Sequence, residues 1–130
     1  MQILETISRK ATAKDTREEY YFAEGCFITE LLNTKDDPAV SVARARVEPG
    51  RTTRWHSLAG IGERYLLVEG SGRVEIGDQP LCEVGPGDVV LIPAGCRQRI
   101  TNTGPCDLIF LAICTPRFVA SAYRDLEEEE

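Results

Sequence analysis

The sequence predicts an all-β protein of one domain. The chain has 130 residues, a length that fits a single domain with one hydrophobic core. From Cys26 onward, Gly and Pro residues bracket short apolar runs, which is the pattern of strands joined by tight turns. Between those runs no stretch of about a dozen residues keeps a helical period. We therefore expect a β-sandwich or small barrel rather than alternating strands and helices.

The chain divides into three parts by composition. Residues 1–25 are polar and are expected to pack on the β domain or extend it, residues 26–116 form that domain, and residues 117–130 hold a short helix and an acidic tail. The helix is expected over Phe118–Leu126, after Pro116. The expected strands are Cys26–Leu32, Val40–Val47, Tyr65–Glu69, Arg73–Ile76, Pro80–Val84, Asp88–Ile92, Gln98–Asn102 and Leu108–Cys114.

Two glycine-rich turns punctuate the middle of the chain. Glu69–Gly72 offers the positive-φ positions of a tight hairpin turn, and Gly85–Asp88 does the same before the next strand. We expect these turns to fix the register of the central strands.

Composition and charge exclude two function classes. No apolar run approaches the roughly 20 residues of a membrane-spanning helix. The net charge is -6, but the closing run Glu127–Glu130 supplies four of the negative charges, so the rest of the chain is close to neutral. This balance argues against nucleic-acid binding. Met1–Lys10 lacks the apolar run of a secretion signal, and the five cysteines are scattered, so we expect a cytoplasmic protein with reduced thiols.

Two segments carry a family resemblance. Residues 49–70 read PGRTTRWHSLAGIGERYLLVEG and residues 87–102 read GDVVLIPAGCRQRITN. With their spacing they resemble the two motifs of the cupin superfamily, and the closing LIFLAICTPRF is similar to that of small stand-alone bacterial cupins. The matching positions are Gly50, His56, Leu58, Glu63 and Gly70 in the first motif and Gly87, Pro93, Gly95, Gln98 and Asn102 in the second.

The resemblance implies a jelly-roll barrel that holds a metal in most relatives through three histidines and one glutamate. Here Leu58 replaces the second histidine and Gln98 the third. The remaining metal ligands are therefore His56, Glu63 and Gln98. Imidazole, carboxylate and amide oxygen form a mixed donor set that suits a divalent Mn, Fe, Ni or Zn ion. Two alternatives stay open: a metal-free ligand or catalytic pocket, and a barrel in which His56 is only structural.

Strand alternation places Glu63 and Tyr65 on one face. If the chain is an enzyme, Glu63 or Tyr65 would move a proton in isomerase- or lyase-type chemistry. A non-haem metal dioxygenase and a non-catalytic sensor are the alternatives. The apolar side chains of Leu66 and Val68, on the opposite face, favour covering by the N-terminal segment or by a second subunit, and the second case predicts a homodimer.

Arg44 and Arg46 also share one face of a strand. If that face looks into the barrel, the two guanidinium groups would suit a carboxylate or phosphate, so that the ligand would be a small polar or anionic molecule. In the alternative, Ala43, Ala45 and Val47 form the core face and the arginines are solvated or paired with Glu48 and Glu75, because unpaired charge in a small core is costly.

Overall fold

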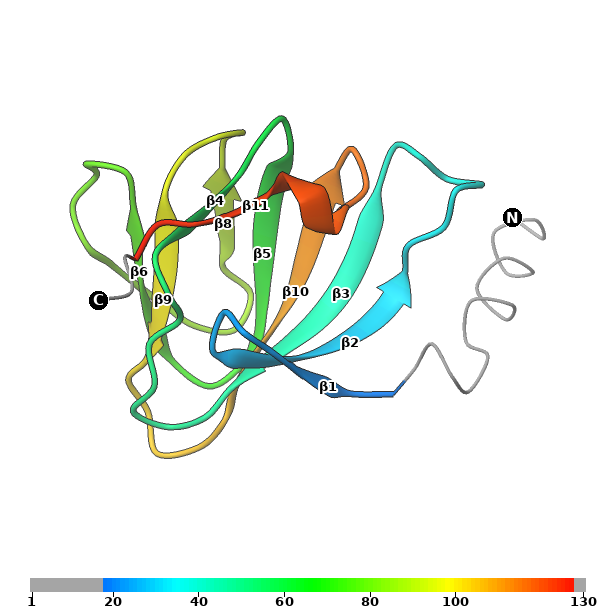
Figure 1. Cartoon of the computed structure of the whole chain (residues 1–130). Coiled ribbons are helices and arrows are strands. Elements are labelled where there is room, and N and C mark those ends of the chain that lie inside the picture. The colour runs from blue at the N-terminus through cyan, green and yellow to red at the C-terminus, as the bar shows by residue number, and fades with distance from the viewer. Residues whose placement is uncertain (1–17, 128–130) are drawn as a thin grey trace.

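In a computed structural model, which describes residues 18–127, the chain forms two β-sheets whose paired strands are antiparallel (Figure 1). One sheet has the spatial order β1 (Tyr20–Phe22), β2 (Cys26–Leu32), β3 (Ser41–Val47), β10 (Leu108–Thr115), β5 (Gly62–Glu69) and β8 (Val89–Ile92). The other has the order β11 (Tyr123–Asp125), β4 (His56–Leu58), β9 (Gln98–Asn102), β6 (Gly72–Ile76) and β7 (Cys82–Val84). The all-β prediction is confirmed.

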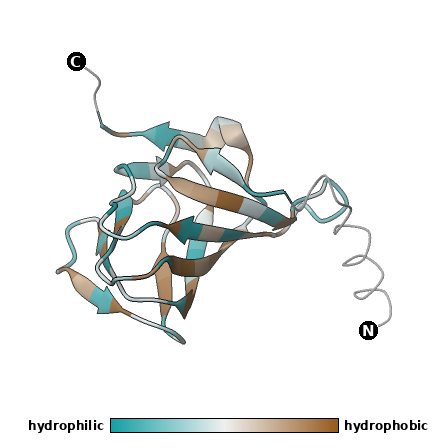
Figure 2. Cartoon of the chain, turned by 90° about the horizontal axis from the view of Figure 1, so that it is seen from below, coloured by the Kyte–Doolittle hydropathy of each residue, from teal (hydrophilic) through white to brown (hydrophobic). Residues whose placement is uncertain are grey.

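The core lies between the two sheets. Figure 2 shows apolar (brown) and polar (teal) stretches on the strands of both sheets. Burial alternates along β5 and β8, because successive side chains point to opposite faces. On β5 the inward positions are Glu63, Tyr65 and Leu67, as predicted, and all three are buried. The main apolar cluster consists of Cys26, Ala45, Val47, Tyr65, Leu67, Val74, Val84, Val90, Ile92, Ile100, Leu108 and Phe110.

The two glycine turns are corners rather than hairpins. Gly70 has a φ of 89° and Gly87 one of 92°, so the predicted backbone conformation is present. However, β5 and β6 belong to different sheets, and so do β7 and β8. The expectation that these turns join paired strands was therefore wrong. At Gly70 a side chain would also clash, because its Cβ would lie 2.7 Å from the Asp107 carbonyl oxygen.

The expected C-terminal helix over Phe118–Leu126 was wrong. The segment makes one 3₁₀ turn at Ala120–Ala122, and β11 then pairs antiparallel with β4. The free edge of β4 explains the difference, because its backbone groups need partners that a helix could not supply. Among the described residues no helix is long and apolar enough to cross a membrane.

The N-terminal part of the described chain extends the sheet. Strand β1 pairs antiparallel with β2, as the expectation for residues 1–25 allowed. The strands β1, β4 and β11 were not predicted, since three residues are too few for an alternation pattern to show. Residues 1–17 and most of the acidic tail, residues 128–130, lie outside the described residues.

Candidate functional site

His56 lies on β4 with its ring inside the barrel, only 2% exposed. Its Nδ1 lies 2.7 Å from the Arg54 carbonyl oxygen, to which it donates a hydrogen bond. Nε2 therefore carries the lone pair. The ring stacks on Tyr123 from β11, with 5.2 Å between centroids. Burial lowers the pKa of His56, although the Arg54 hydrogen bond and the Glu63 charge oppose this shift, so the neutral imidazole is favoured.

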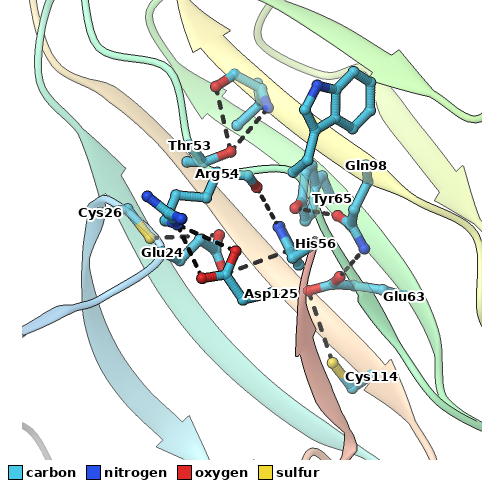
Figure 3. Close-up of polar contacts among 12 residues, drawn as sticks. Glu24, Cys26, Thr53, Arg54, His56, Glu63, Tyr65, Gln98, Cys114 and Asp125 are labelled. Carbon is cyan, nitrogen blue, oxygen red and sulfur yellow. Dashed lines mark hydrogen bonds and ion pairs between the residues drawn. The ribbon is translucent and has the colours of Figure 1, made fainter. Parts of the chain in front are cut away.

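Glu24 is a site residue that the sequence analysis missed. It lies in the turn between β1 and β2, and its Oε1 lies 3.5 Å from His56 Nε2 (Figure 3). The backbone explains this placement, because the Arg54 N–H donates to the Glu24 carbonyl oxygen at 2.8 Å. Arg54 thus anchors both residues. The Cys26 thiol donates to Glu24 Oε2 at 3.6 Å, and burial raises the pKa of Glu24 to about 7.

Glu63 lies on β5, in the sheet that faces the sheet of His56 and Gln98, and its carboxyl accepts hydrogen bonds from two donors. Gln98 Nε2 donates to Glu63 Oε1 at 2.9 Å, so a hydrogen bond joins β9 to β5 across the interior (Figure 3). The Cys114 thiol donates to Glu63 Oε2 at 3.8 Å. Burial, followed by the negative charge of Glu24, raises the pKa of Glu63 to about 7, against the opposing effects of Gln98 and His56.

Tyr65 completes this chain of hydrogen bonds. Its hydroxyl donates to Gln98 Oε1 at 2.5 Å, which fixes the orientation of the amide and leaves Nε2 facing Glu63. Burial raises the pKa of Tyr65 well above its ordinary value. The phenol proton is therefore held on Tyr65 and engaged with Gln98, which makes Tyr65 a support for the amide in this arrangement.

A small cavity of about 70 Å³ opens beside these groups. Glu24, Glu63 and Tyr65 line it, whereas His56 and Gln98 lie behind the two carboxyl groups. Each cavity carboxyl thus has its own buried partner. Within the described part of the chain, no Arg or Lys side chain lines this cavity.

The three predicted metal ligands do not fit a divalent ion as they are arranged. The Oε1 atom of Gln98, which would coordinate the metal ion, accepts a hydrogen bond from the Tyr65 hydroxyl instead. Leu58 is buried at the position of the missing histidine. Over residues 18–127, no group of three or more His, Cys, Asp or Glu side chains could hold a metal ion. Metal occupancy stays a prediction from sequence.

The two arginines of β3 lie outside the barrel. Arg46 pairs with Glu19 at 2.9 Å and with Asp107 at 3.3 Å, and its guanidinium lies over the ring of Phe27. Arg44 contacts Glu19 as well, at 3.7 Å. The alternative is confirmed for Ala45 and Val47, which are buried, whereas Ala43 is only partly buried. The partners of the arginines are Glu19 and Asp107 and not the predicted Glu48 and Glu75. An anionic ligand in the cavity would have no basic lining group to pair with.

Comparison with known proteins gives the same architecture. Residues 43–114 match the family model of the cupin domain. The solved structure of Pac13, a nucleoside dehydratase, aligns at 18% identity and a TM-score of 0.73, covering 91% of each chain. A Streptomyces PAC13 variant with uridine aligns at the same identity and coverage with a TM-score of 0.74. KdgF from Halomonas sp. aligns at 16% identity and a TM-score of 0.70, over 82% of this chain and 94% of that one.

A larger protein contains a similar unit. Oxalate decarboxylase from Bacillus subtilis aligns at 20% identity and a TM-score of 0.74, over 86% of this chain but 30% of that one. No curated protein sequence matches this chain significantly. At these identities the structural likeness is evidence for the fold alone.

Proposed function

This chain belongs to the cupin domain family, and we propose that it is a small cupin that uses two carboxyl groups for lyase- or isomerase-type chemistry without a metal. One observation carries the proposal: Glu24 and Glu63 line the same buried cavity, and the pKa of each is raised to about 7. Near neutral pH, one carboxyl can therefore be ionised while the other keeps its proton. This is the pairing that general acid–base catalysis requires.

The hydrogen-bond partners assign a role to each carboxyl. Glu63 accepts hydrogen bonds from Gln98 and Cys114, which stabilise the ionised form. Glu24 faces the lone pair of His56 Nε2, an arrangement that favours a protonated carboxyl. Glu63 is thus the general base and Glu24 the general acid. His56 acts through Glu24, and Gln98 through Glu63, as positioning residues.

The simplest reaction for such a pair is loss of water from a hydroxylated substrate. Glu63 takes a proton from carbon, the electron pair of that C–H bond forms the new double bond, and Glu24 protonates the departing hydroxyl group. Water leaves with the proton of Glu24, and Glu63 keeps the proton taken from carbon. Glu63 then releases that proton to solvent and Glu24 takes one up, which restores the starting state. For an isomerisation, the acid would instead return a proton to another carbon. That a cupin barrel is found in a nucleoside dehydratase supports the proposal at the level of the fold.

The first test measures the two carboxyl groups directly. In protein labelled with ¹³C-glutamate, we expect two side-chain carboxyl resonances to titrate near pH 7, one lost in Glu24→Gln and the other in Glu63→Gln. Glu83→Gln is the matched control, because Glu83 is exposed on β7. If no resonance titrates above the ordinary glutamate range, the proposed acid–base pair does not exist.

The second test measures turnover. A panel of β-hydroxycarbonyl compounds is assayed for water loss in the presence of EDTA. We expect activity to survive EDTA and the Glu83→Gln change, and to disappear in Glu24→Gln and Glu63→Gln. Activity that falls with EDTA and returns with Mn, Fe, Ni or Zn would overturn the metal-free proposal and favour the metal-dependent isomerase, lyase or dioxygenase predicted from sequence.

The remaining predictions from sequence are kept as proposals. A non-catalytic sensor would bind ligand without turnover in the same panel.

The predicted homodimer is tested by light scattering. The reason for predicting it holds in part, since Val68 is exposed on the outer face of β5. A cytoplasmic location also remains a proposal.

A further inference from the structure

We infer that the mouth of this cavity selects a substrate carrying a positively charged amine, and that Glu30 is the residue that recognises this charge. The inference rests on the proposed function in taking the cavity as the ligand site. It adds the substrate class and a specificity-determining residue, which the acid–base pair alone does not define.

The cavity has an inner and an outer part that differ in exposure. Its inner wall is formed by buried side chains, among them Glu63, Tyr65 and Phe110. Its outer wall contains Glu30, Phe22 and Tyr20, and Tyr20 is 44% exposed. The outer part is therefore the mouth. A ligand that enters contacts Glu30 before it reaches Glu63.

The charges along this path all have one sign. Three carboxyl side chains line the cavity, from Glu24, Glu30 and Glu63, and among the described lining residues none is Arg or Lys. Arg46 is turned outward and engaged by Glu19 and Asp107. An anionic substrate would be repelled by the carboxylates of Glu30 and Glu63 and would meet no basic side chain among the described lining residues, whereas these two carboxylates would attract a cation.

The mouth also supplies aromatic faces beside the carboxylate. Tyr20 Oη donates to Glu30 Oε2 at 3.3 Å, which holds the carboxylate next to the Tyr20 ring. Phe22 and Phe118 line the same opening. A carboxylate among aromatic rings is the combination that binds ammonium groups, through ion pairing and cation–π attraction.

Inner and outer groups together define the substrate. The amine would bind at Glu30, while a hydroxylated or carbonyl-bearing carbon of the same molecule reaches Glu24 and Glu63. Because the cavity holds only about 70 Å³, the reacting end must be small. The substrate class is thus a short hydroxylated or carbonyl amine.

The experiment compares three small probes that differ in charge: ethanolamine, ethylene glycol and glycolate. Each is titrated into ¹⁵N-labelled full-length protein at neutral pH, and binding is read from amide chemical shifts near the cavity. We expect ethanolamine to bind about fivefold more tightly than ethylene glycol, as a half-exposed ion pair with cation–π contacts would give, and glycolate more weakly than either.

Two variants place the preference on Glu30. Glu30→Gln should abolish the advantage of ethanolamine over ethylene glycol, whereas Glu83→Gln should preserve it. Equal or tighter binding of glycolate, an unchanged preference in Glu30→Gln, or no binding of ethanolamine would each overturn the inference. None of these results touches the titration of Glu24 and Glu63, so this inference can fail while the proposed function stands.

Discussion

Strand β5 points Glu63 into one end of the barrel and Leu67 into the other, four residues further along the same face. The two side chains are almost equally buried, at 8% and 2% exposure. Around Leu67 the neighbours belong to the apolar cluster, whereas Glu63 meets a carboxyl, an amide and a thiol. The difference between the two ends is therefore one of chemistry and not of burial.

This contrast shows how a small barrel can hold a polar site. Desolvation of Glu24 and Glu63 opposes folding at neutral pH, as their raised pKa values indicate. The apolar end offsets this cost through buried hydrocarbon surface. We therefore expect the apolar end to respond mainly to truncation of a side chain and the polar end to respond mainly to pH.

The largest effect is expected at the apolar end. Leu67→Ala removes a fully buried side chain from the cluster and should lower the free energy of unfolding by about 2–5 kcal/mol. Chemical denaturation measures this loss. Val68→Ala is the matched control, because Val68 is exposed on the opposite face of the same strand. Similar losses in the two variants would contradict the inward assignment of Leu67.

The polar end should show its effect through pH. An unfolded glutamate releases its proton near 4.5, whereas folded Glu63 keeps it until about 7. Between these values the folded state binds more protons, so its stability is fully present below pH 4.5 and declines as pH rises through 7. Glu63→Gln should flatten this decline by roughly 2 kcal/mol between pH 5 and 7.

His56 contributes to the pH dependence of stability with the opposite sign. Since the pKa of His56 is lowered, the unfolded state binds more protons just below pH 6.5, and stability there rises with pH. This opposing contribution is larger in Glu63→Gln, because the variant lacks the Glu63 charge that raises the pKa of His56. The difference between the two denaturation curves therefore reports Glu63 together with its coupling to His56. Parallel curves across the whole range would show that this carboxyl titrates normally.

The smallest effect is expected at Tyr123. Tyr123→Phe deletes a buried hydroxyl that has no partner, so it should stabilise the ligand-free protein by about 1 kcal/mol. Thermal unfolding measures the gain. A destabilised variant would mean that Tyr123 has a partner in the ligand-free protein.

The motif residues predicted much of the site. His56, Glu63 and Gln98 were expected to converge because the cupin resemblance implies that they line the inside of the barrel, and all three side chains are buried. Their chemistry was harder to foresee. Gln98 accepts a hydrogen bond from Tyr65 and donates one to Glu63. These bonds depend on the orientation of the amide, which no local sequence pattern predicts.

Glu24 could not be found from sequence, for a definite reason. It lies 32 positions before His56 and outside both motifs. Its place in the site depends on the backbone bond from Arg54 and on the turn at Gly25, whose φ is 106°. An acidic residue before a glycine is a common turn signal, so nothing marked this one as functional.

Taken alone, the sequence determined the fold class, the inward faces of β5 and β9, and the site residues other than Glu24, because alternation is a local property and the motif resemblance marks the remaining positions. Tertiary structure decided which strands pair, that the segment after Pro116 becomes a strand, and that Glu24 meets His56. These outcomes depend on backbone hydrogen bonds and desolvation between residues far apart in the chain, which no local pattern records.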